Sequence, residues 1–145
     1  MLEIIKQFLF SFVSTIGFSV LFNTPKGLIG KSGFVGGIGW VVFYITGLYL
    51  NNKIISTFLA ALTVGILGEL FARYFKKPAT VFIIPGIIPL VPGAGMYYTM
   101  LTLSQRDFYA AATKGTETIF IAAAISTGLI ISTTLSKSIR RVKNK

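Results

Sequence analysis

The side chains that could do chemistry in this chain are few. Cysteine and histidine are both absent from its 145 residues. The only carboxylates are Glu3, Glu69, Asp107 and Glu117. This composition excludes thiol chemistry, disulfides, an imidazole base and a metal site with several protein ligands. No nucleophile stands beside a base and an orienting group in the sequence, so we expect no enzyme activity, no cofactor and no metal. Ligand binding must then depend largely on backbone groups.

The uncharged stretch Thr80–Leu103 could supply such groups. Its interior prolines and glycines are Pro85, Gly86, Pro89, Pro92, Gly93 and Gly95. Each interior proline costs about 3 kcal/mol in a regular helix, so the stretch predicts a broken membrane span. A broken backbone in hydrocarbon must face protein or a wet cavity, and transporters use such half-helix ends to bind substrates. We expect these six residues to bind a small-molecule substrate. A kinked helix that binds nothing is the alternative.

Side chains around this stretch add further candidates. Tyr97, Tyr98 and Asn23 could each hydrogen-bond a polar substrate, or only another helix. Glu69 is the one carboxylate inside a predicted span, which makes it the candidate for proton coupling. An ion pair with Arg73, one helical turn further on, is the competing interpretation. Glu117 begins the last predicted span, where a carboxylate complements the helix dipole.

The elements that must position these residues are membrane helices. The chain is 53% hydrophobic and 12% charged, which is typical of a polytopic membrane protein and too apolar for a soluble domain. We predict an all-α integral membrane protein with one domain, 1–145. The expected spans cover about 4–22, 33–50, 54–74, 80–103 and 117–135. Residues 104–116 are expected to form an interfacial half-helix or an ordered loop. Small residues recur at intervals of four in the second, third and fifth spans, which predicts helix-packing faces.

Basic residues indicate the orientation of these spans in the lipid bilayer. The net charge is +10, but the basic residues lie between apolar runs and at the C-terminus, so we expect no nucleic-acid binding. Five crossings divide the 14 basic residues into four on one side and ten on the other. This predicts an outside N-terminus and a cytoplasmic C-terminus. A re-entrant fourth segment would divide them seven and seven, which argues against it.

Several segments resemble a known family. They are Phe18–Pro25, Ser56–Ala60 and above all Ile88–Gly93 with Tyr97 and Tyr98. Together they resemble the threonine/serine exporter family, and more closely its small split subunit, which corresponds to the C-terminal transmembrane half of the fused exporters. The resemblance covers essentially the whole chain.

The resemblance implies a bacterial plasma-membrane exporter subunit for threonine or serine, driven by the proton-motive force. Some relatives of this two-component type are associated with export of succinate, so a dicarboxylate substrate stays open. A larger membrane subunit is the implied partner, and the small-residue helix faces are consistent with one. A non-transporting assembly subunit is the alternative function, and a homo-oligomer is also open.

Overall fold

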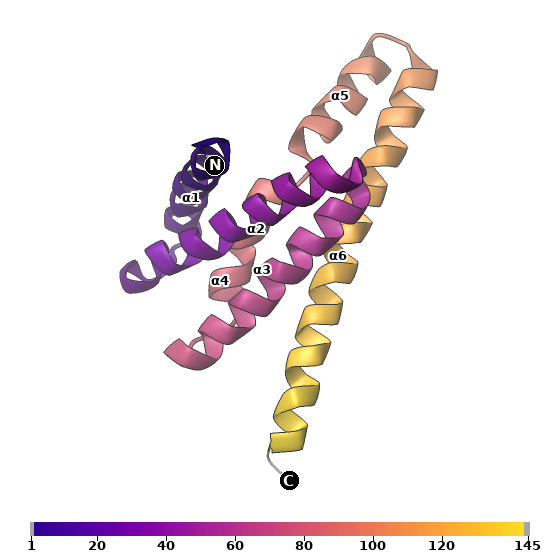
Figure 1. The fold of residues 1–145 in the computed structure, drawn as a ribbon. Helices are drawn as coiled ribbons and strands as arrows, with labels where there is room; N and C mark the ends of the chain where they lie inside the picture. Colours follow the sequence, from indigo (N-terminus) through magenta and orange to yellow (C-terminus); the bar gives the residue numbers. More distant parts are fainter. Residues whose placement is uncertain (1, 144–145) are drawn as a thin grey trace.

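The computed structural model describes residues 2–143, which fold almost entirely into helices (Figure 1). In chain order the elements are α1 (Leu2–Leu21), η1 (Lys26–Leu28), α2 (Ile29–Leu50), α3 (Lys53–Phe75), α4 (Thr80–Ile87), η2 (Ile88–Leu90), α5 (Gly93–Ser104) and α6 (Phe108–Lys143). The prediction of an all-helical protein is confirmed.

The helices are long and apolar enough to form membrane spans. Within the described residues, four helical stretches pass this test alone: α1, η1 with α2, α3, and α6 up to Ser136. The segments Thr80–Leu90 and Gly93–Ser104 pass it only as a pair, with a bend of 48° between them. The protein is therefore a multi-pass membrane protein with four to five candidate spans. The break that its prolines and glycines predict is confirmed, and the bent pair has the form of either a broken span or a re-entrant loop.

The tight turn between α2 and α3 is built by two asparagines. Asn51 ends α2 in the left-handed conformation, with a φ of 47°. Asn52 caps α3, because its side chain accepts hydrogen bonds from the amides of Ile54 and Ile55 at 3.0 and 3.2 Å. The turn fixes Lys53 as the first residue of α3.

The last helix begins earlier than the sequence indicated. Residues 104–116 were expected to form a half-helix or loop, but α6 already starts at Phe108. Asp107 is the physical reason: its carboxylate accepts the amide of Ala110 at 3.0 Å, as a helix cap does. The alanines that follow are strong helix formers, so α6 runs for 36 residues. In Figure 1, α5 and the first part of α6 form a hairpin that extends past the α2–α3 turn.

The predicted packing faces meet one another inside the chain. A Cβ atom on Gly128 of α6 would lie 3.1 Å from the Cβ of Ala61 on α3. Gly33 of α2 lies equally close to Phe12 of α1, 3.1 Å from a ring atom by the same measure. Glycine therefore allows both helix pairs to approach closely, as small residues do in membranes. These small-residue faces already pack against helices of the same chain, so they give no support for a partner subunit.

Candidate functional site

The broken span divides the predicted substrate-binding residues into a buried half and an exposed half. Pro85 lies inside α4 and is fully buried together with Gly86. A Cβ atom on Gly86 would come within 3.1 Å of Val35 and 3.2 Å of Val64, so this half of the span packs against α2 and α3. Pro89 is half-buried in η2. The first half of the break therefore serves helix packing.

The second half of the break is more exposed than the first. Pro92 precedes α5, and among the described residues no side chain caps the N-terminus of that helix. In its first turn the amide of Gly93 donates to the carbonyl oxygen of Val91 and that of Met96 to the carbonyl oxygen of Pro92, which leaves the amides of Ala94 and Gly95 as the free donors at this partly positive helix end. Gly93 is exposed, and Gly95 is half-buried against Thr118 of α6. Tyr98 is half-exposed, at 50%.

A cavity of about 300 Å³ lies beside this N-terminus, between the start of α3, the first turns of α5 and the first half of α6. It brings together three of the predicted residues, Pro92, Gly95 and Tyr98. The remaining lining residues are Lys53, Ala94, Lys114, Glu117, Thr118 and Ile121. Gly93 and Tyr97 lie next to this set in sequence, but neither lines the cavity.

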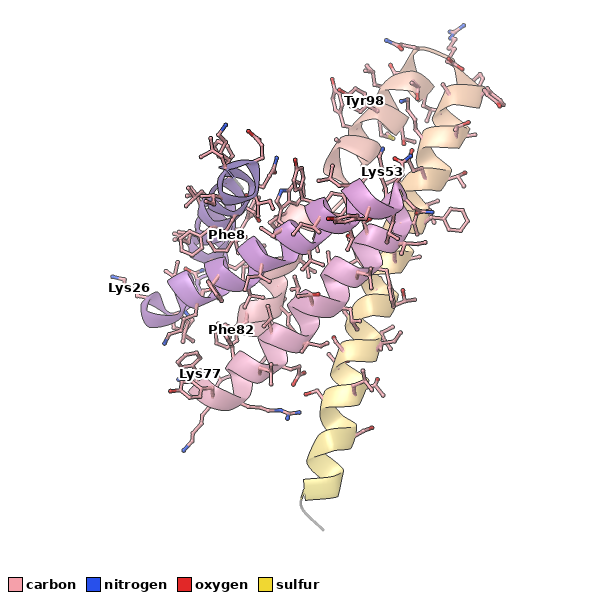
Figure 2. The ribbon with its side chains drawn as sticks, viewed as in Figure 1. Phe8, Lys26, Lys53, Lys77, Phe82 and Tyr98 are labelled. Atoms are coloured by element: carbon pink, nitrogen blue, oxygen red, sulfur yellow. The ribbon has the colours of Figure 1, made fainter. Side chains whose placement is uncertain are left out.

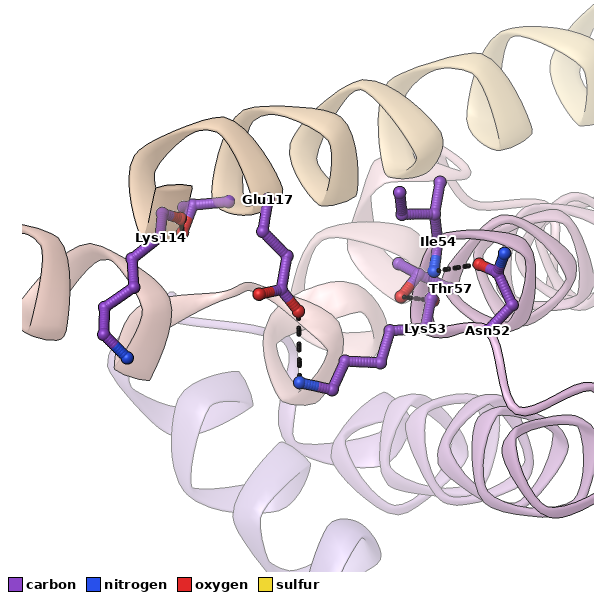
Figure 3. Close-up of polar contacts among 7 residues, drawn as sticks. Asn52, Lys53, Ile54, Thr57, Lys114 and Glu117 are labelled. Carbon is purple, nitrogen blue, oxygen red and sulfur yellow. Dashed lines mark hydrogen bonds and ion pairs between the residues drawn. The ribbon is translucent and has the colours of Figure 1, made fainter. Parts of the chain in front are cut away.

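Three charged side chains, Lys53, Lys114 and Glu117, stand in a cavity wall that is otherwise largely apolar. Lys53 and Glu117 form an ion pair with 3.1 Å between Nζ and Oε1 (Figure 3). Lys114 places its Nζ 5.5 Å from the centre of the Tyr98 ring. With two ammonium groups and one carboxylate, the wall holds one excess positive charge, and the free amides of α5 add to it. Such a wall can bind a carboxylate, and Tyr98 can accept a hydrogen bond from an amino or hydroxyl group.

Sequence reasoning assigned Glu117 wrongly and missed Lys53 and Lys114 as site residues. Glu117 does not cap a helix, because α6 begins at Phe108 and the carboxylate pairs across the cavity with Lys53. Asp107 was the signal that could have placed Lys114 and Glu117 within a helix. Read as a helix cap, it places Lys114 and Glu117 three residues apart on one face of a helix.

Asn23 is not brought to the cavity. It follows α1 as an exposed residue with a left-handed φ of 53°. The chain then enters α2, whose 22 residues span about 33 Å before the turn that leads to Lys53. Figure 2 shows Lys26, just after Asn23, and Lys53 at opposite ends of α2.

Glu69 belongs to a second polar cluster, far along α3 from the cavity. The hydroxyl of Ser136 donates to Oε2 of Glu69 at 2.8 Å. Arg73 donates to the hydroxyl and the carbonyl oxygen of the same serine, at 2.6 and 2.5 Å. The ion pairs of the described residues are Lys6–Glu3 and Lys53–Glu117, so the expected contact between Glu69 and Arg73 runs through Ser136.

The chain is similar to a known protein family over most of its length. Residues 7–135 match the family described as Threonine/Serine exporter, ThrE. An uncharacterized protein from Haemophilus influenzae is 31% identical over 107 residues, which cover 72% of this chain and 35% of that protein. The chain thus spans about a third of the length of this curated relative. No solved structure matches the chain.

Proposed function

The chain belongs to the threonine/serine exporter family, and on this premise we propose that it is a subunit of a membrane exporter of small polar metabolites. Threonine and serine are the first candidate substrates, and succinate or a related dicarboxylate is the alternative. The observation that carries the proposal is the charged cavity at the break of the fourth span.

The chemistry of the cavity supports a carboxylate substrate. Its volume of about 300 Å³ lies at the small end of ligand pockets, which suits a metabolite with few atoms. Lys53, Lys114 and the free amides of α5 are donors for a carboxylate. Tyr98 is an acceptor for an amino or hydroxyl group. An unwound segment beside such groups is the arrangement by which transporters bind substrates inside the membrane.

A larger membrane subunit is the proposed partner. The chain covers 35% of its relative from Haemophilus influenzae, so that protein contains a long additional region. In a split exporter, a separate subunit would supply the equivalent of such a region. Because the glycine faces of α2 and α6 are occupied within the chain, the partner would contact other surfaces.

Proton-motive coupling is the proposed energy source, and Glu69 is its candidate residue. The carboxylate is half-buried and bonded to Ser136 near the ends of α3 and α6. Replacing Glu69 with Gln keeps the hydrogen-bonding capacity but removes the titratable group. We expect this variant to lose the dependence of export on a pH gradient. A variant that exports with unchanged gradient dependence would remove Glu69 from the mechanism.

Export of labelled threonine, serine and succinate tests the proposal. The assay compares cells that express this chain alone, a gene for the proposed larger membrane subunit alone, and both. We expect both genes to be required, and the solute that leaves faster to identify the substrate. Lys114→Gln should slow this export, whereas Lys6→Gln, a matched change of an exposed lysine on α1, should not.

The second candidate function is a non-transporting assembly subunit. It is favoured if the partner alone exports at the full rate. It also predicts that substitutions at Pro92 and Gly93 change only the amount of complex, whereas a substrate-binding subunit would change the concentration of solute at half-maximal export.

A further inference from the structure

In the ion pair of the cavity, the carboxylate of Glu117 contacts the ammonium group of Lys53, which a ligand carboxylate could also bind. We infer that Glu117 occupies the place of a ligand carboxylate on Lys53, so that the ion pair lowers the affinity of the cavity and promotes ligand release. This inference rests on the proposed export function. It concerns the regulation of the same site, and it assigns Glu117 a role that opposes binding.

The position of Lys53 makes it a shared ligand for two carboxylates. Its backbone is fixed at the start of α3 by the cap that Asn52 forms (Figure 3). Its side chain lines the cavity and ends 3.1 Å from Oε1 of Glu117, which reaches across from α6. A carboxylate that enters the cavity would need the same ammonium group that Glu117 already uses.

The exposure of the pair allows the exchange. The Lys53 side chain is 73% exposed and that of Glu117 is 47% exposed, so the described part of the chain leaves both groups open. Ion pairs in such surroundings are weak, and a ligand carboxylate can replace one at little cost. The competition is therefore expected to reduce affinity only about two- to fivefold.

The second lysine of the cavity is arranged differently. Lys114 stands over the Tyr98 ring at 5.5 Å, and it is not among the ion pairs of the described residues. In Figure 3 its side chain points away from Glu117. Lys114 can thus hold a ligand without displacing a carboxylate, while Lys53 alternates between the ligand and Glu117. This difference between the two lysines would favour export, because Glu117 can replace the ligand carboxylate on Lys53 and so speed ligand release.

Exchange assays on the full chain with its partner in proteoliposomes test the inference. The measured quantity is the external concentration of labelled L-threonine, L-serine or succinate at half-maximal exchange. Glu117→Gln should lower this concentration about two- to fivefold for whichever solute the wild-type protein exchanges. Lys53→Gln should raise it. The double variant should behave like Lys53→Gln, because Glu117 has nothing to compete for once the ammonium group is gone.

The controls separate competition from other effects of charge. Glu3→Gln breaks an ion pair of the same kind on α1, with 2.9 Å between Lys6 and Glu3, and should leave half-maximal exchange unchanged. An increased or unchanged concentration in Glu117→Gln would overturn the inference while leaving the export function intact. If Glu117→Gln lowers the concentration equally in the presence and absence of Lys53, competition is also wrong. No exchange by the wild-type protein would overturn the proposed function, and this inference with it.

Discussion

Replacing Gly128 with alanine should destabilise the bundle, because at this glycine α6 lies close to the backbone of α3. The added Cβ atom would lie 2.9 Å from the carbonyl oxygen of Phe58 and 3.1 Å from the amide nitrogen of Leu62. Both are backbone atoms, which cannot rotate away as a side chain can. The two helices must therefore move apart over their whole interface.

The expected magnitude follows from two opposing terms. Overpacking a tight interface costs about 1–3 kcal/mol, and replacing glycine by alanine within a helix returns about 1 kcal/mol. Because the neighbours of Gly128 are backbone, we expect a net loss of about 1–2 kcal/mol, or a fall in melting temperature of about 3–6 °C.

Heating the purified protein in detergent and measuring the monodisperse fraction that survives tests this expectation. Gly17→Ala is the matched control, since no atom lies within 4 Å of a Cβ atom at that position in α1. The control should melt at the wild-type temperature or above. A Gly128→Ala protein as stable as this control would refute the account of the α3–α6 interface.

Further variants test the polar contacts. Ser136→Ala removes the hydroxyl that joins Glu69 to Arg73, and we expect a loss of about 1–2 kcal/mol, seen as a lower melting temperature. Asp107→Ala removes the cap of α6 and should cost about 1 kcal/mol, seen as faster hydrogen exchange in its first turn but not in α3. Gln7→Leu removes the acceptor, at 2.7 Å, of the indole N–H of the single tryptophan, and its emission should shift to shorter wavelength.

The sequence predicted those features that depend on local chemistry. The break in the fourth span follows from the missing amide and the ring clash of each proline, and these act on neighbouring residues only. The bend of 48° confirms the prediction. The small-residue stripe that includes Gly128 was also recognisable, because helical periodicity alone puts its members on one face.

The cavity could not be predicted in the same way, because it depends on contacts between distant segments. The ion pair in it joins Lys53 and Glu117, which are 64 positions apart in sequence. The cluster at the other end joins Glu69 and Ser136 across 67 positions. Neither partner is indicated by residue type or spacing. Asn23 shows the opposite error. Its polar character suggested a ligand contact, but the length of α2 separates it from the cavity.

Helix α6 is uninterrupted over 36 residues, and it lies close to the backbone of α3 at Gly128. A tilt of α6 about this contact would therefore move its two ends in opposite directions. Glu117 lies about 16 Å from this point in one direction, and Ser136 about 12 Å in the other. A tilt of α6 by about 5° about the Gly128 contact would move Glu117 by about 1.4 Å and Ser136 by about 1 Å in the opposite direction. If α6 tilts as a rigid body, the contact of Glu117 with Lys53 and the contact of Ser136 with Glu69 would change together. Such a tilt would separate the helices at one end of α6 and bring them closer at the other.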